Sequence, residues 1–290
     1  MFNSLSIPSP GWSAFHLGPL TIHAYALCIL TGIILGWMLA KRRFMARGGD
    51  GEAFEEVLGA AVVAGIIGAR LYHVITDHQL YFGPGKRPIE ALYIWNGGLG
   101  IWGGVALGAL TAWLLCRRKG MDFATMADAG APALILAQAI GRVGNWFNQE
   151  LFGRPTTLPW GLEIDAVHRP RGYEQFATFH PTFGYEMLWN LAGVAFLLWA
   201  ERRFRLSHGR LFALYVAYYC AGRLWIEHLR IDPVNTAAGF RLNEYTSVIV
   251  FAAAVLAFVL LGRWQRRTER SASTAMSKQL PRNTTETIRS

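Results

Sequence analysis

Long apolar runs alternate with short polar segments along the whole chain. A helix needs about 20 mostly apolar residues to cross the hydrocarbon core of a bilayer, and this length identifies seven candidate segments. The predicted spans cover residues 20–40, 57–75, 97–116, 123–140, 183–200, 211–229 and 245–261. The pattern therefore predicts an all-α polytopic membrane protein with about seven transmembrane helices in a single domain over residues 1–262.

The two longest polar segments carry predictions of their own. Residues 149–182 contain four prolines and form a connection far longer than an ordinary loop, which is typical of a small folded cap. Residues 263–290 are rich in Ser, Thr and Arg and poor in apolar residues. This composition predicts a disordered basic tail that lies near an anionic leaflet.

Composition and charge support the membrane assignment and set its orientation. The 290-residue chain is 52% hydrophobic and 16% charged, whereas soluble proteins have roughly 25% charged residues. Most of the 28 lysines and arginines follow odd-numbered spans, in residues 41–47, 117–119, 202–210 and 263–290. The positive-inside rule places these clusters in the cytoplasm. We therefore expect a multi-pass protein of the bacterial cell membrane, with the N-terminus outside, the cap extracytoplasmic and the C-terminus cytoplasmic.

Several functional classes are disfavoured by the same sequence. The net charge of +9 does not indicate a nucleic-acid partner, because each basic cluster abuts a span end without interleaved aromatic residues. Cys28, Cys116 and Cys220 lie in or at the end of apolar runs, with no metal-ligand spacing. No glycine loop of a phosphate-binding type is present. We therefore expect no metal and no cofactor.

Polar residues within the predicted spans cluster at one depth. Charged groups inside a bilayer are expensive and mark functional sites by default. Those in the outer third are His23, Tyr25, Arg70, His73, Arg142, Asn145, Glu186, Arg223 and Glu227. Asp128 alone lies deep toward the cytoplasm. This asymmetry predicts one polar, net basic site that opens to the outer leaflet rather than a conduction path.

Each of these groups also has a structural interpretation. Arg223 and Glu227 are four residues apart and Glu227 and Arg230 three apart, a spacing typical of a structural ion-pair ladder. Arg70 and Glu186 are candidates for a buried ion pair between spans. The glycines of residues 97–104 are typical of close helix contacts.

Residues 141–153, the signature segment, read Gly-Arg-Val-Gly-Asn-Trp-Phe-Asn-Gln-Glu-Leu-Phe-Gly. Helix packing does not require two glycines, an arginine, two amides and a carboxylate at a membrane exit. The segment resembles the prolipoprotein diacylglyceryl transferase family, whose signature G-R-x-G-N-x-x-N-x-E-x-x-G it matches throughout. The resemblance extends along nearly the whole chain, through His23-Ala24-Tyr25, Gly68-Ala69-Arg70, Trp95-Asn96-Gly97-Gly98, His180-Pro181, Tyr185-Glu186 and residues 219–232.

The resemblance implies transfer of a diacylglyceryl group from phosphatidylglycerol to the lipobox cysteine thiol of a prolipoprotein, with release of glycerol phosphate. A membrane lipid presents its phosphate at the depth of Arg142 and Arg223, and a guanidinium can bind two phosphate oxygens at once. By the same resemblance, the catalytic candidates are Arg142, Arg223 and Tyr25. The residues expected to bind or orient the substrates are Arg142, Asn145, Gly153, Glu150, Glu227 and Arg230.

The chain departs from the family pattern at one position. Where the resemblance implies a histidine proposed as a base, this sequence has Trp102, whose indole has no basic nitrogen lone pair. Tyr25, Tyr219 and His180 remain candidate proton acceptors, and direct capture of the substrate thiolate by the arginines is a further possibility.

Two other functions are alternatives to the transferase. A non-enzymatic lipid or anion transporter would use the same arginines for headgroup binding. It would also require a polar path to the cytoplasm, and Asp128 is the only residue that supports such a path. An intramembrane protease needs a serine–histidine arrangement or paired membrane aspartates, and the sequence has neither.

Overall fold

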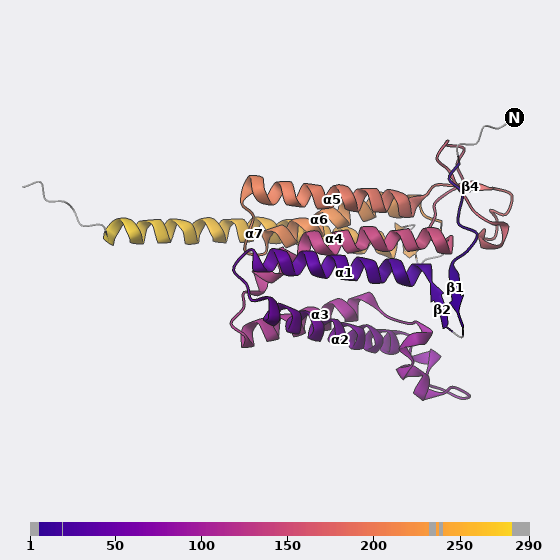
Figure 1. The fold of residues 1–290 in the computed structure, drawn as a ribbon, viewed down its shortest axis with the longest axis horizontal. Helices are drawn as coiled ribbons and strands as arrows, with labels where there is room; N and C mark the ends of the chain where they lie inside the picture. Colours follow the sequence, from indigo (N-terminus) through magenta and orange to yellow (C-terminus); the bar gives the residue numbers. More distant parts are fainter. Residues whose placement is uncertain (1–5, 19, 232–235, 238–239, 280–290) are drawn as a thin grey trace, which may run out of the picture. The chain divides into compact units, whose positions relative to one another are not determined.

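A computed structural model describes residues 6–18, 20–231, 236–237 and 240–279, with side chains for 6–18, 20–231 and 243–266. Seven α-helices of 18 residues or more dominate the described part of the chain, and its strands form only two-stranded sheets (Figure 1). The predicted all-α class is therefore confirmed. The chain divides into two compact units, an N-terminal unit of Pro10–Asn148 and a C-terminal unit of Gln149–Ser290 with Met1–Ser9.

The N-terminal unit begins with a hairpin of β1 (Ala14–Leu17) and β2 (Leu20–His23). Four helices follow, α1 (Ala24–Met45), α2 (Gly51–Thr76), α3 (Ile101–Arg118) and α4 (Phe123–Asn148). The side chain of Asp50 caps α2 by accepting hydrogen bonds from the amides of Glu52 and Ala53. Helix α1 packs along α4, and α2 packs along α3 (Figure 1).

Glycines bring the helix backbones of this unit into direct contact. A Cβ atom on Gly68 of α2 would lie 2.3 Å from the carbonyl oxygen of Gly103 in α3, and one on Gly103 would lie 2.1 Å from that of Gly68. A Cβ on Gly32 of α1 would lie 2.8 Å from the carbonyl oxygen of Ala137 in α4. Such small-residue contacts are characteristic of helix packing in membranes, and they confirm the close-contact interpretation for Gly103.

Between α2 and α3 the chain forms three short 3-10 helices, η1 (His78–Leu80), η2 (Pro88–Leu92) and η3 (Ile94–Asn96). Gly97 and Gly98 follow with φ of 81° and 72°. This left-handed backbone suits glycine and penalises other residues. The two glycines turn the chain back toward α2, where the Gly100 amide donates to the Ala69 carbonyl at 2.8 Å.

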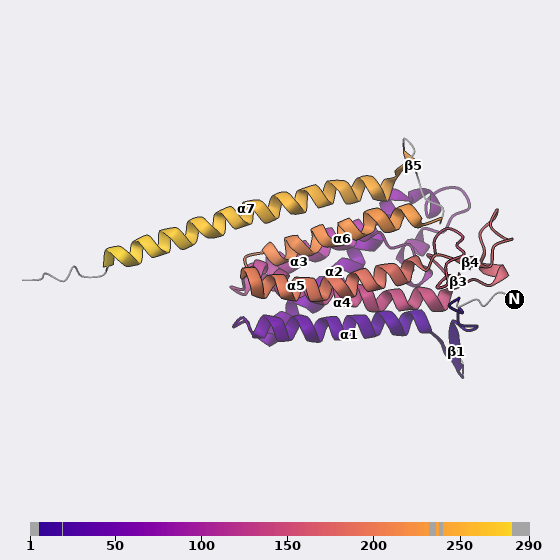
Figure 2. The same ribbon diagram turned by 90° about the horizontal axis from the view of Figure 1, so that it is seen from above.

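The C-terminal unit contains α5 (Thr182–Phe204), α6 (Arg210–Leu229) and α7 (Leu242–Gln279). Helix α6 packs between α5 and α7, as seen in Figure 2. A two-stranded hairpin of β5 (Thr236–Ala237) and β6 (Phe240–Arg241) precedes α7.

Residues 149–182 form a small cap within this unit. The cap pairs β3 (Leu162–Glu163) with β4 (Thr178–Phe179) and includes the 3-10 helix η4 (Ala166–His168). Its buried apolar side chains are Phe152, Leu162, Ile164 and Phe179. Ile7 joins it from the N-terminus, since its amide donates to the Gly161 carbonyl at 2.8 Å and its carbonyl accepts from Glu163 at 2.9 Å.

The helix boundaries differ from the predicted spans, and four of the differences change the local structure that was expected. Residues 20–23 are extended rather than helical, because they pair with residues 14–17. Residues 97–100 form a turn, and α4 continues past 140 to Asn148. Helix α7 continues to Gln279 where a disordered tail was predicted from residue 263, since residues 263–279 contain good helix formers and neither Gly nor Pro. The rest of that predicted tail, residues 280–290, lies outside the described residues.

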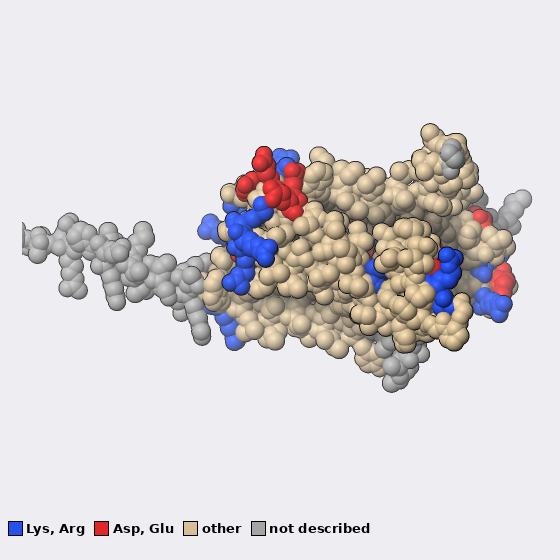
Figure 3. Space-filling model, turned by 90° about the horizontal axis from the view of Figure 1, so that it is seen from below, with Lys and Arg blue, Asp and Glu red and all other residues tan. Residues whose placement is uncertain are grey.

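Among the described residues, four helices are long and apolar enough to cross a membrane, namely α1, α2, α4 and residues 243–266 of α7. The total of seven spans stays a prediction. On the face that α2 and α3 present in Figure 3, charged side chains gather near the helix ends and the surface between them is uncharged. At the start of α2, Lys41 pairs with Glu55 at 2.6 Å and Lys119 with Glu56. This distribution fits helices whose middle part faces lipid.

Candidate functional site

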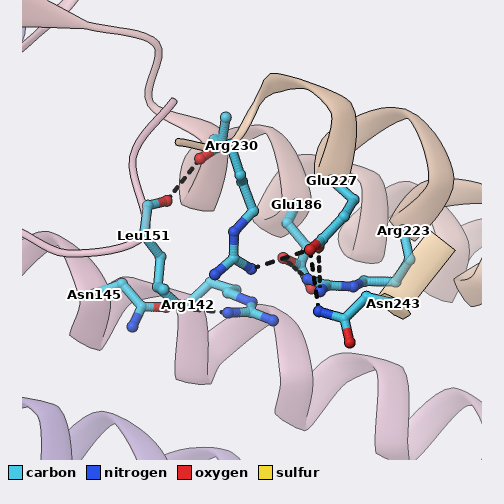
Figure 4. Close-up of polar contacts among 9 residues, drawn as sticks. Arg142, Asn145, Leu151, Glu186, Arg223, Glu227, Arg230 and Asn243 are labelled. Carbon is cyan, nitrogen blue, oxygen red and sulfur yellow. Dashed lines mark hydrogen bonds and ion pairs between the residues drawn. The ribbon is translucent and has the colours of Figure 1, made fainter. Parts of the chain in front are cut away.

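The C-terminal unit holds an ion-pair cluster built on one face of α6. Arg223 donates from Nη2 to Oε2 of Glu227 at 2.6 Å and from Nη1 to Oε2 of Glu186 at 3.4 Å. Glu186 lies on α5, so the guanidinium joins two helices (Figure 4). The ladder predicted from the spacing of Arg223 and Glu227 is therefore present. The predicted pair of Arg70 with Glu186 joins residues of different units and stays a prediction.

Glu227 is the centre of this cluster. Glu227 is 1% exposed, and its Oε1 accepts a hydrogen bond of 3.0 Å from Nδ2 of Asn243, at the start of α7 (Figure 4). Arg230 Nη1 lies 3.9 Å from Oε2. A buried carboxylate is stable only when paired and hydrogen-bonded, and these contacts use both of its oxygens. Glu227 thus fixes the positions of two guanidinium groups.

The end of the signature segment joins the end of α6 within the same unit. Gly153 pairs with Arg230 in an antiparallel bridge, and the Arg154 amide donates to the Leu229 carbonyl at 3.0 Å. A Cβ on Gly153 would lie 2.7 Å from Thr182 Cγ2 and 2.8 Å from the Leu229 carbonyl oxygen. The position therefore requires glycine, and the main chain of Gly153 fixes where Arg230 leaves the helix.

Glu150 lies between two residues with left-handed backbone. Gln149 has φ of 49° and Leu151 has φ of 56°, a conformation that costs a non-glycine residue about 1–2 kcal/mol. The side-chain amide of Gln149 donates to Oδ2 of Asp165 at 2.6 Å, and its oxygen accepts from the Asp165 amide at 2.8 Å. Thr182 Oγ1 donates to the Leu151 carbonyl at 2.6 Å. These bonds hold the strained turn that carries Glu150.

The N-terminal unit holds the other predicted site residues, on α1 and α4. Arg142 Nη1 donates to Oδ1 of Asn145 at 3.3 Å, and Asn145 is buried (Figure 4). Both residues lie within α4, whereas the sequence predicted that the span ends before them. Tyr25, in the first turn of α1, lies against Gly144 of the signature segment. The structure therefore brings Tyr25 to the helix that carries Arg142 and Asn145.

Arg70 donates its hydrogen bonds to main-chain carbonyls. Its Nε donates to the Ala91 carbonyl at 2.7 Å, Nη2 to that of Glu90 at 2.7 Å, and Nη1 to those of Gly97 and Gly98 at 2.6 and 3.0 Å. The guanidinium also lies over the ring of Tyr81, 5.0 Å from its centroid. Arg70 thus folds the connection between α2 and α3 onto the end of α2.

His180 belongs to a hydrogen-bonded group of the cap with Trp160 and Tyr185. Trp160 Nε1 donates to the Tyr185 oxygen at 3.0 Å, and that oxygen lies 3.1 Å from Nδ1 of His180. The direction of the bond between this hydroxyl and Nδ1 depends on the tautomer of the imidazole. Burial lowers the pKa of His180, which favours the neutral imidazole. Nδ1 of His180 is thus engaged with Tyr185, and His180 stays a candidate proton acceptor.

Sequence reasoning missed two contributors to these clusters. Asn243 precedes the apolar run of the last span and carries no periodic signal, so its bond to Glu227 depends on the packing of α7 against α6. Gln149 occupies a variable position of the signature, and its role becomes visible only through its bonds to Asp165.

Tyr219, another of the candidate proton acceptors, lies one turn before Arg223 on α6. The centroid of its ring is 6.4 Å from that of Tyr215.

Comparison with known proteins identifies the family. A family model described as prolipoprotein diacylglyceryl transferase matches residues 13–260. A phosphatidylglycerol–prolipoprotein diacylglyceryl transferase of Cutibacterium acnes is 62% identical, over 90% of this chain and 88% of that protein. One from Streptomyces coelicolor is 55% identical over 88% of this chain and 80% of its own length, and one from Corynebacterium efficiens is 50% identical over 97% and 91%. The chain belongs to the prolipoprotein diacylglyceryl transferase family.

Proposed function

We propose that this chain transfers the diacylglyceryl group of phosphatidylglycerol to the thiol of a lipobox cysteine in a prolipoprotein signal peptide. In this reaction the thiol sulfur forms a bond to the terminal glycerol carbon of the diacylglyceryl group. The bond from that carbon to the phosphate oxygen breaks, and glycerol phosphate leaves with the electron pair. The thiol proton is the only other group to be removed, so the reaction needs no redox partner and no cofactor.

The observation that carries the proposal is the fixed orientation of Arg223. Two carboxylates hold its guanidinium, and the side chain is still 15% exposed. A charge held in place before the reaction stabilises charge that develops in the transition state without reorganisation. We assign Arg223 and Arg142 to the phosphate of the lipid, where a guanidinium can donate two parallel hydrogen bonds.

The other predicted site residues have supporting roles in this proposal. Glu227 orients Arg223 and Arg230, and Gly153 sets the main-chain position of Arg230. Asn145 orients Arg142 through their hydrogen bond. Glu150 contributes a carboxylate from the strained turn, and Tyr25 donates a hydrogen bond from the start of α1.

The proposed location is the bacterial cell membrane, with the cap and the N-terminus outside and the C-terminus in the cytoplasm. The charge pattern supports this orientation, because the basic clusters of residues 41–47, 117–119 and 202–210 lie at the C-terminal ends of α1, α3 and α5. A precursor exported across the membrane would then meet the lipid headgroup at the outer leaflet.

The test is direct. The purified protein is incubated with phosphatidylglycerol vesicles and a lipobox peptide, and the peptide is analysed by mass spectrometry. The proposal expects a mass increase of one diacylglyceryl group on the cysteine, together with released glycerol phosphate. An unmodified peptide, with lipid moved between vesicles, would instead support the transporter.

A further inference from the structure

The carboxylate of Glu227 holds two donors, one on each of its oxygens. Its Oε2 accepts from Nη2 of Arg223 at 2.6 Å, and its Oε1 accepts from Nδ2 of Asn243 at 3.0 Å (Figure 4). The carboxylate is buried, so bulk water does not compete for either bond. The guanidinium of Arg223 and the carboxamide of Asn243 are therefore fixed beside each other, and all three residues belong to the C-terminal unit.

The carboxamide of Asn243 has hydrogen-bonding capacity that this contact does not use. The residue is exposed, and the bond to Glu227 is the one hydrogen bond that its side chain makes to the described residues. An asparagine side chain offers two N–H donors and one acceptor oxygen. In Figure 4 the oxygen lies on the side of the amide that faces away from Glu227. One N–H thus sets the orientation, and the oxygen and the second N–H can bind another molecule.

Asn243 lies at the end of the unit where a bound lipid presents its headgroup. It is the second residue of α7 and bonds to the last turns of α6, which ends at Leu229. The cap lies at this end, because the Arg154 amide donates to the Leu229 carbonyl at 3.0 Å. Beyond Ser247, α7 is apolar through Leu261. Acyl chains lie along this apolar part, so the headgroup lies toward Asn243.

We propose that Asn243 recognises the glycerol headgroup of phosphatidylglycerol while Arg223 binds the phosphate. This inference rests on the proposed function, which places the lipid phosphate at Arg223. The headgroup glycerol is attached directly to that phosphate and carries two hydroxyls, and a hydroxyl both donates and accepts hydrogen bonds. The remaining oxygen and N–H of the carboxamide match this chemistry. Asn243 is therefore a specificity-determining residue for the departing group.

The bond to Glu227 prepares Asn243 for this contact. It orients the carboxamide before the lipid binds, so recognition of the headgroup costs little additional side-chain entropy. The same carboxylate orients Arg223, so the phosphate contact and the headgroup contact keep a fixed relation to each other. A headgroup without hydroxyls would still meet the guanidinium but would leave the carboxamide unused.

The test compares two lipids with the full-length protein and a lipobox peptide. Phosphatidylcholine vesicles carry either phosphatidylglycerol or phosphatidylpropanol, whose headgroup has the same three carbons but no hydroxyl. Both lipids release a phosphate monoester, so the chemistry of the leaving group is similar. The wild-type protein should prefer phosphatidylglycerol by about 3- to 10-fold in kcat/KM, as expected for one or two exposed hydrogen bonds. Asn243→Ala should lose this preference.

The ratio of kcat/KM for the two lipids separates recognition from structure. Loss of the bond to Glu227 lowers the rates with both lipids equally, whereas loss of the headgroup contact lowers only the rate with phosphatidylglycerol. His228→Gln is the matched control at the same junction of α6 and α7. The His228 side chain is 72% exposed, and its Nδ1 lies 3.9 Å from Oε1 of Glu244. This variant should keep the wild-type preference.

Two outcomes would overturn the inference. A wild-type protein that uses both lipids equally well would show that the headgroup hydroxyls are not recognised, and this result depends on no variant. Asn243→Ala with the full wild-type preference would leave Asn243 only the structural role of holding Glu227. Asn243→Ser is a second, milder variant with a shorter polar side chain, and it should also lower the preference. A wild-type protein that modifies the peptide with neither lipid would instead refute the proposed function.

Discussion

The ring of Tyr25 at the start of α1 lies directly on Gly144 of α4. A Cβ on Gly144 would be 2.5 Å from Cδ2 of the tyrosine and 3.0 Å from its Cα atom. A Cβ at this position would contact both the ring and the main chain of Tyr25. Rotation of the Tyr25 side chain alone would therefore not relieve the clash. Gly144 therefore determines where the tyrosine hydroxyl lies relative to Asn145.

Gly144→Ala should displace Tyr25 and lower the transfer rate at least tenfold, while the protein still inserts into the membrane. Rates of diacylglyceryl transfer to a lipobox peptide measure the effect. Gly130→Ala on the same helix is the control, because no atom lies within 4 Å of a Cβ at Gly130. If Gly144→Ala matched this control, the contact with Tyr25 would have no role in positioning.

Arg223→Lys should lose most of the activity, by about 10- to 100-fold, since hydrogen bonds to charged groups each contribute about 1.5–3 kcal/mol. A single ammonium cannot replace Nη1 and Nη2, which reach Glu186 and Glu227 separately. Arg142→Lys should have a similar effect. If both arginines act on one phosphate, the double variant should lose less than the product of the two single losses. Near-normal turnover in either single variant would contradict its assigned role.

Gln149→Gly and Gln149→Ala separate backbone strain from side-chain bonding. Both variants lose the two hydrogen bonds to Asp165, but only glycine adopts the φ of 49° without strain. The glycine variant should therefore be more stable than the alanine variant by about 1 kcal/mol. Thermal unfolding in detergent measures the difference. An alanine variant as stable as the glycine variant would show that the turn relaxes.

The stability of the cap should decline at acid pH because of His180. Burial lowers the pKa of this imidazole in the folded state, so the unfolded chain takes up the proton at higher pH. The stability that the neutral imidazole contributes is therefore complete above its pKa in the unfolded chain, about 6.5. It is lost as the pH falls through the lower pKa of the folded state. His180→Gln should lose less stability than the wild-type protein over this interval. Identical pH dependence of their melting temperatures would argue against the assignment.

The orientation in the membrane is testable with single cysteines in a variant that lacks Cys28, Cys116 and Cys220. A cysteine at Thr156 in the cap should react with an impermeant thiol reagent in intact cells. A cysteine at Ser277 should react only after the cells are opened. The reverse pattern would invert the topology and would place the site on the cytoplasmic side.

Apolar length predicted the helices well, because burial in lipid requires about 20 apolar residues whatever the tertiary structure. The helix ends were less predictable. Residues 20–23 are apolar enough for a span, but their pairing with residues 14–17 makes them extended. Helix α7 continues past the apolar run, because helix propensity in residues 263–279 does not depend on hydrophobicity.

The site was predictable only where its residues share a helix. The spacing of Arg223 and Glu227 predicted their ion pair, since residues four apart lie on one helical face. The roles of Glu186 and Asn243 depend on packing among α5, α6 and α7, which leaves no local pattern. His73 and Asp77 are also four apart and pair, but the contact of His73 with Gly98 depends on a turn of positive φ that has no local pattern.

The interlocked backbones at Gly68 and Gly103 allow the intervening chain to vary in length. The register of α2 against α3 is set at these glycines and by the carbonyls that Arg70 holds, so the tip of the connection contributes nothing to it. No atom lies within 4 Å of a Cβ placed at Gly83 or Gly85. Insertions or deletions around residues 83–87 therefore leave both helices in alignment, and this tip is a suitable place for an epitope or a fluorescent label.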